Sequence, residues 1–161
     1  MKKTLYNALR AAKPANVAEI IPAYSHDVKS ENLPQITGVA KAAELLWPFF
    51  ELPNIREEFK IILLDRRNRV LGVVNLSTGS VSGTVVDVPL ILALACSCRA
   101  SGVALAHNHP SGDTTPSEAD KTITKKIKQA LALVDIHLID HFIFSGQDGS
   151  KYLSFANEGL L

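Results

Sequence analysis

Residues 103–120 read VALAHNHPSGDTTPSEAD, and this segment places two histidines at the end of an apolar run. The run itself, residues 103–106, predicts a short buried strand. Because side chains alternate along a strand with a period of two, His107 and His109 should point to the same side. Both imidazoles can then reach one ion.

A third metal ligand follows the histidines at a fixed spacing. The Pro-Ser-Gly at residues 110–112 predicts a sharp turn, and a helix that begins near Ser117 should bring Asp120 back toward the strand end. Two imidazoles and one carboxylate are a usual ligand set for catalytic zinc, with the fourth position left to water. The same spacing also fits a capping box, in which Ser117 and Asp120 satisfy free amides at the start of the helix.

The composition limits the class of protein. The chain has 161 residues, 47% of them hydrophobic and 20% charged, which indicates a globular unit with a real core. Seventeen Lys and Arg against sixteen Asp and Glu leave a net charge of +1, far from the basic surface of a dedicated nucleic-acid binder. The longest apolar stretch, residues 90–96, is too short to cross a membrane. We therefore expect a soluble protein.

The two cysteines, Cys96 and Cys98, cannot form a disulfide framework. They also lack the spacing of a zinc knuckle, so we expect both to lie on a helix as core residues of the protein. Because no apolar run follows the first lysines of the chain, the sequence gives no signal peptide and predicts a cytoplasmic protein.

The first 55 residues differ from the rest, with five of the eight prolines and no long periodic element. We expect residues 1–55 to be an N-terminal extension and residues 56–161 to form the domain. Within the extension, residues 39–50 predict a helix up to Pro48, whose apolar face docks on the domain.

The domain should contain a hairpin followed by two helices. Residues 59–65 and 70–76 predict two largely buried strands. The three arginines between them are typical of a solvated hairpin tip, and the alternative is that they contact phosphate. Asp87 should cap a helix that runs to about Ala100 and is ended by Gly102.

The helix at residues 117–134 has an apolar stripe opposite a row of lysines. The stripe contains Ile123, Ile127, Leu131 and Val134, and the row contains Lys121, Lys125 and Lys128. The sequence thus predicts an α/β domain whose mixed sheet is sandwiched between the two helices.

Several motifs together resemble the RadC family of JAB/MPN (JAMM) metalloproteins. They are residues 107–112, the Pro-Ser-x-x-Asp at 116–120, the Leu-Ile-Asp-His at 138–141, the Ser-Phe at 154–155 with Gly159, and the strand at 59–65. They extend over residues 57–161, so the chain resembles a RadC-like domain with a short N-terminus. The resemblance implies the JAMM fold, a three-layer architecture like that of cytidine deaminases, with zinc at a strand end.

The resemblance also implies a role for each site residue. His107, His109 and Asp120 would be the zinc ligands, and Ser117 would hydrogen-bond beside the reacting water. JAMM proteins use an upstream glutamate, which in RadC-like sequences stands two residues before the opening phenylalanine of the strand. That position selects Glu57. Alternation agrees in part, since Glu57 shares a face with the phenylalanine but lies at the very end of the strand, and the alternative is Glu58.

The implied activity is that of a zinc-dependent metallopeptidase or isopeptidase that acts on an unknown peptide or protein substrate. The alternative is a DNA-associated RadC-type protein, which the family name connects to DNA repair. The net charge of the chain does not support nucleic-acid binding. The string His-Asn-His is not the scattered motif of HNH nucleases, and the deaminase signature is absent. His137, Asp140 and His141 either orient a ligand imidazole or belong to an ordinary strand.

Overall fold

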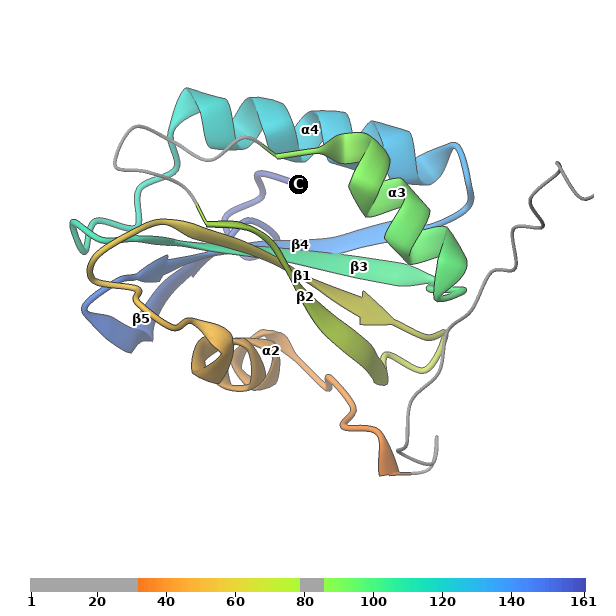
Figure 1. Ribbon diagram of the computed structural model, residues 1–161, viewed down its shortest axis with the longest axis horizontal. Helices are drawn as coiled ribbons and strands as arrows, with labels where there is room; N and C mark the ends of the chain where they lie inside the picture. The colour runs from red at the N-terminus through yellow and green to blue at the C-terminus, as the bar shows by residue number, and fades with distance from the viewer. Residues whose placement is uncertain (1–31, 79–85) are drawn as a thin grey trace, which may run out of the picture.

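The computed structural model describes residues 32–78 and 86–161, which form a five-stranded mixed sheet with helices on both faces (Figure 1). The strands are β1 (Glu58–Leu64), β2 (Val70–Thr78), β3 (Gly102–His109), β4 (His137–Ser145) and β5 (Asp148–Ser154). Their spatial order is β2-β1-β3-β4-β5. Strands β3 and β4 are parallel, and the other neighbouring pairs are antiparallel. The predicted α/β class and mixed sheet are confirmed.

The predicted hairpin is present as β1 and β2. The Asp65 carboxylate shapes its turn, because Oδ1 accepts hydrogen bonds from the amides of Arg67 and Arg69 at 2.8 and 2.9 Å. Every residue of β1 is buried, whereas most of β2 is only half-buried. The prediction that both strands are largely buried is therefore wrong for β2, since this strand forms the edge of the sheet.

The helices form the outer layers of the fold. Helices α3 (Val88–Ser97) and α4 (Glu118–Ala132) pack on one face of the sheet (Figure 1). The other face is covered by α2 (Val39–Leu46) and the 3-10 turn η2 (Trp47–Phe49). The three-layer architecture is confirmed, but the expectation that α3 and α4 lie on opposite faces is wrong.

The shared face of α3 and α4 follows from the strand order. The chain moves from β2 through α3 to β3, and then from β3 through α4 to β4, so both connections cross the sheet in the same direction. Each connection also joins two parallel strands. Strands β2 and β3 are parallel because both are antiparallel to β1, and β3 and β4 pair directly in parallel. Parallel crossovers are almost always right-handed, and two right-handed crossovers in one direction place their helices on one face.

The ends of α3 differ in part from the prediction. Asp87 caps the helix, with its Oδ1 accepting a hydrogen bond from the Leu90 amide at 3.1 Å. The helix ends at Ser97, and Gly102 opens β3 instead of ending the helix. Cys96 is exposed and Cys98 is half-buried. The core placement of Cys96 is wrong, because α3 buries only the stripe made by Val88, Ile91 and Ala95.

Helix α4 buries Ile127 and Leu131 as expected, and it exposes the three lysines. It ends at Ala132, so Val134 lies beyond the helix and is 43% exposed. The prediction that Val134 continues the apolar stripe is therefore wrong.

Helix α2 docks on the sheet through a fully buried leucine. Leu46 has 0% exposure and packs with Ala42 and Ala43 in a core that includes Phe142 and Phe144 of β4. The docking of this helix is thus observed, while the division of the chain at residue 55 stays a prediction, and residues 1–31 lie outside the described part. Among the described residues, none of the helices has the length and hydrophobicity needed to span a membrane.

We predict that Leu46→Ala lowers the free energy of unfolding by about 2–5 kcal/mol, because it leaves a cavity between α2 and the sheet. The same substitution at Leu133, which is 87% exposed, should change it by less than about 0.5 kcal/mol. Urea unfolding of both variants measures the difference. Equal midpoints would show that α2 contributes little to the stability of the sheet.

Candidate metal centre

Two histidines at the end of β3 lie on the face covered by α4. His107 and His109 alternate with Asn108, and their Nε2 atoms are 3.0 Å apart. The His107 ring is 4% exposed and stacks on Phe59 of β1, its antiparallel partner, with ring centroids 5.8 Å apart. The predicted alternation is confirmed, and it directs both imidazoles to one point.

Asp120 in the first turn of α4 completes the cluster. Its Oδ1 lies 3.2 Å from Nε2 of His107, and its Oδ2 lies 3.8 Å from Nε2 of His109. Oδ2 also accepts hydrogen bonds from the Ser117 amide and hydroxyl at 2.8 and 2.6 Å. The Ser117 hydroxyl in turn accepts one from the Asp120 amide at 3.1 Å. The capping box is therefore present, and it aims one oxygen of Asp120 at the histidines.

A chain of hydrogen bonds fixes which nitrogen of His107 carries the proton. The Thr124 hydroxyl lies 2.5 Å from the Asp120 carbonyl oxygen, which can only accept, and 2.6 Å from Nδ1 of His141. Nδ1 of His141 must therefore donate to Thr124, so Nε2 of a neutral His141 is an acceptor. This Nε2 lies 2.8 Å from Nδ1 of His107, which must donate. The proton-free Nε2 of His107 then faces the cluster.

A backbone carbonyl also fixes which nitrogen of His109 carries the proton. Nδ1 of His109 lies 2.6 Å from the carbonyl oxygen of Asp113 and donates to it, which leaves Nε2 without a proton. Burial lowers the pKa of His107 to about 4, although the Asp120 carboxylate acts in the opposite direction. Burial also holds the pKa of His141 well below its usual range. The buried rings are thus neutral at pH 7, as metal ligation requires.

The three side chains can hold a metal ion. Their ligand atoms all lie within 4.8 Å of one another. A tetrahedral zinc ion with bonds of about 2.0–2.1 Å would separate its ligands by about 3.3 Å, close to the spacings of the cluster. Two nitrogen lone pairs and a carboxylate oxygen converge here with no proton between them, an arrangement that a cation stabilises.

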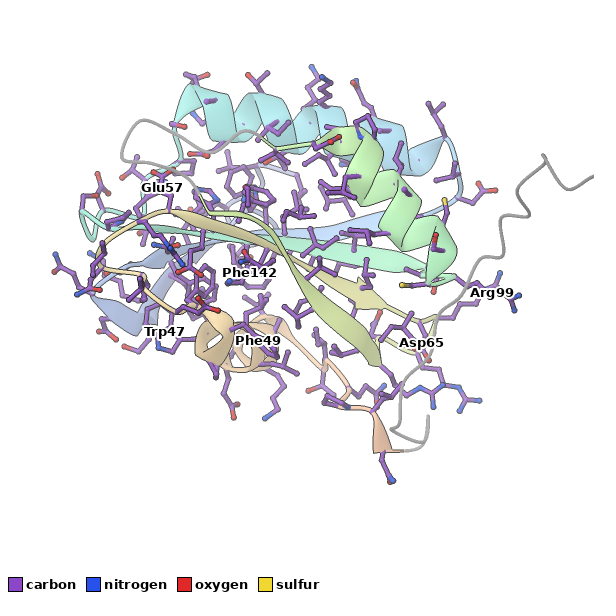
Figure 2. The ribbon with its side chains drawn as sticks, in the orientation of Figure 1. Trp47, Phe49, Glu57, Asp65, Arg99 and Phe142 are labelled. Carbon is purple, nitrogen blue, oxygen red and sulfur yellow. The ribbon has the colours of Figure 1, made fainter. Side chains whose placement is uncertain are left out.

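Alternation along β1 separates the two candidate glutamates. Glu57 stands just before β1 and lines the same cleft as the three ligands, on the side of the sheet that carries α4 (Figure 2). Glu58 has 0% exposure and points to the other face, where it pairs with Lys60 at 2.8 Å. The geometry thus leaves Glu57 as the glutamate beside the cluster, and its role as a base stays a prediction.

The buried carboxylate of Glu58 holds the loop that carries Glu57. It accepts hydrogen bonds from the amides of Leu52 and Glu51 at 2.8 and 3.2 Å. Burial by itself raises the pKa of Glu58, but the hydrogen bonds from Lys60 and these amides outweigh it and leave the pKa below its usual value. Glu58 is therefore a charged structural anchor.

Asn108 fastens the same loop to β3. It is fully buried and accepts a hydrogen bond from the Glu58 amide at 2.8 Å. Its amide nitrogen donates to the carbonyl oxygens of Pro53 and Arg56 at 2.6 and 2.8 Å. Sequence reasoning missed this role, although the period of two already placed Asn108 on the face opposite to the histidines.

The three polar residues of β4 named in the sequence analysis have different surroundings. His141 lies against His107 as described, so the interpretation of it as an orienting partner fits the geometry. Asp140 instead accepts hydrogen bonds from the Ser154 hydroxyl at 2.5 Å and the Ala156 amide at 2.9 Å, which fixes the C-terminal turn. His137 is exposed and lies at the opposite end of β4.

Sequence reasoning also missed Thr124, which stands beside the predicted apolar stripe. The feature of the sequence that could have identified it is a threonine four residues after Asp120, on the side of the helix expected to be buried. We predict that Thr124→Val lowers the affinity for zinc about tenfold, because Nδ1 of His141 loses its acceptor and no longer orients His107. Competition with a zinc chelator measures the affinity.

Thr122→Val is the matched control, since Thr122 is exposed on the same helix. Its zinc affinity should equal that of the wild type. If Thr124→Val also binds zinc as tightly as the wild type, the hydrogen-bond chain does not support the ligand.

Comparison with known proteins identifies the family. The model of the RadC-like JAB domain matches residues 36–160. A UPF0758 protein of Porphyromonas gingivalis is 39% identical over 163 aligned residues, which cover 98% of this chain and 70% of the relative. A UPF0758 protein of Flavobacterium johnsoniae is 43% identical over 80% of this chain and 54% of its own length.

A third relative, the UPF0758 protein YfjY of Escherichia coli, is 48% identical over 66% of this chain and 64% of its own length. The chain thus spans between about half and 70% of the length of these relatives. The family match covers the metal cluster, the cleft and all five strands. The chain belongs to the RadC family of JAB-domain proteins.

Proposed function

We propose that this protein is a JAMM-type zinc metallopeptidase or isopeptidase that cleaves an amide bond in a peptide or protein. Membership of the RadC-like JAB family supports a JAMM-type hydrolase. The observation that carries the proposal is the convergence of three ligand atoms beside Glu57 in one cleft of about 710 Å³.

The roles of the residues follow from their positions. Zinc, when bound by His107, His109 and Asp120, would lower the pKa of a water molecule and polarise the carbonyl of the substrate. Glu57 would take the proton from the attacking water and return it to the leaving amine. Ser117 would donate its hydroxyl proton to the oxyanion, a contribution of about 3 kcal/mol in comparable sites. For this donation the hydroxyl must turn away from Asp120, to which it donates in the capping box.

We predict that the purified protein contains about one zinc ion per chain and that His109→Ala loses it. Glu57→Gln should keep the zinc but hydrolyse peptides about 10²- to 10⁴-fold more slowly, because the water loses its general base. Elemental analysis gives the metal content. Mass spectrometry of a proteome-derived peptide library gives the rate of cleavage.

Glu118→Gln is the control, since Glu118 is an exposed glutamate that pairs with Lys121 at the start of α4. It should keep both zinc and activity. A wild-type protein without a bound metal would contradict the proposal, and a fully active Glu57→Gln would contradict the assignment of the base.

One observation favours the alternative function, association with nucleic acid. A second recess of about 1200 Å³ lies at the other end of the sheet, where the β1–β2 turn meets the C-terminal ends of α3 and α4. Of the five arginines that the structure describes, four line it, namely Arg66, Arg67, Arg69 and Arg99. The Arg69 guanidinium pairs with the Asp65 carboxylate at 2.6 Å, and none of the lysines that the structure describes lines the recess. Guanidinium groups suit phosphate better than ammonium groups because they bind it in a bidentate manner.

For this alternative we predict that duplex DNA binds in a salt-dependent manner and that the double charge reversal of Arg66 and Arg67 to Glu weakens binding at every salt concentration. The slope of log affinity against log salt should fall by about one for each lost phosphate contact. Fluorescence anisotropy measures it. Charge reversal of Lys125 and Lys128, on the exposed face of α4, is the control. If the lysine pair and the arginine pair weaken DNA binding equally, the recess has no special role in binding.

A further inference from the structure

The cleft beside the metal cluster is lined by polar and by apolar side chains. The polar ones include the candidate ligands, Ser117 and Glu57. The apolar ones include Ile55, Val86 and Ile123, which we call the apolar wall. Ile55 is 62% exposed, and Val86 and Ile123 are half-buried. Three branched aliphatic side chains from three separate segments therefore line the cleft, although Val86 and Ile123 also pack against the core below it.

The apolar wall lies next to the reacting position. Ile123 follows the ligand Asp120 by three residues on α4, so both side chains lie on the same face of the helix. Ile55 belongs to the loop that carries Glu57 and is fastened by Asn108. Val86 directly precedes Asp87, the cap of α3. A group bound against Ile123 would lie within one helical turn of Asp120.

Among the described residues that line the cleft, Arg56 is the one lysine or arginine, and it lies beside two carboxylates. The Arg56 guanidinium lies 3.4 Å from the Glu51 carboxylate and 3.7 Å from that of Glu58. A charged substrate group that lay directly against these three aliphatic side chains would lose water without gaining a hydrogen bond from them, which is unfavourable. Burial of an apolar side chain against the same residues is favourable.

We propose that the apolar wall receives a bulky apolar side chain carried on the carbon next to the scissile carbonyl. The substrate is then a peptide or protein with a branched aliphatic or aromatic residue on the acyl side of the cleaved amide. This inference rests on the proposed function, because the carbonyl is placed by the metal site.

Hydroxamates test the inference without a known substrate, since they bind zinc through the carbonyl and leave the neighbouring carbon free. The probes are acetohydroxamate, isocaproyl hydroxamate and succinic monohydroxamate, titrated into zinc-loaded protein by calorimetry. We expect isocaproyl hydroxamate to bind at least about tenfold more tightly than acetohydroxamate. The charged succinic probe should bind no more tightly than acetohydroxamate.

Ile123→Asn and Ile55→Asn should each reduce the ratio of the isocaproyl to the acetyl affinity. The change at Ile55 tests the wall at an exposed site, where folding is least affected. Leu133→Asn, at the exposed end of α4, should keep the ratio. Equal affinities for the three probes, or a ratio that survives both substitutions in the wall, would overturn the inference while leaving the metal site intact. A protein that binds no zinc would overturn the proposed function and the inference with it.

Discussion

The site depends on the register between β1 and β3. Phe59 stands opposite His107, and with alternating side chains this pairing divides the polar residues between the two faces. The histidines turn toward α4, while Asn108, Glu58 and Lys60 turn toward α2. A shift of β1 by one residue would turn Glu58 and Lys60 toward the α4 face and Phe59 away from it, so Glu57 would no longer lie on the side of the histidines.

The two faces then serve different purposes. On the α4 side, a chain of hydrogen bonds between neutral groups leads from the Asp120 carbonyl through Thr124 and His141 to His107. This chain joins the start of α4 to the His107 imidazole. On the α2 side, charged groups are buried together. Lys60 pairs with Glu58 and lies 5.1 Å above the ring of Phe50, so the charge is compensated where water is excluded.

These buried polar groups hold the loop that carries Glu57 in place. Residues 51–57 belong to no strand or helix, yet Glu58 of β1 and Asn108 of β3 satisfy the amides of Glu51 and Leu52 and the carbonyls of Pro53 and Arg56. Gly146 closes the arrangement, because a Cβ at this position would lie 2.1 Å from the Pro53 carbonyl oxygen. The backbone of this loop, which carries Ile55 and Glu57, is therefore held beside the cleft although it lies outside the sheet.

The sequence alone determined the features that depend on local spacing. The alternation of His107 and His109, the capping box of Ser117 and Asp120, and the hairpin all follow from periods and turn residues within a few positions. The faces of α3 and α4 were also implied by the handedness of crossovers, but only once the strand order is known. The link from Thr124 through His141 to His107, the exposure of Cys96 and the apolar wall required the tertiary structure. Each of them joins or exposes residues according to packing between distant segments, and no local pattern encodes that packing.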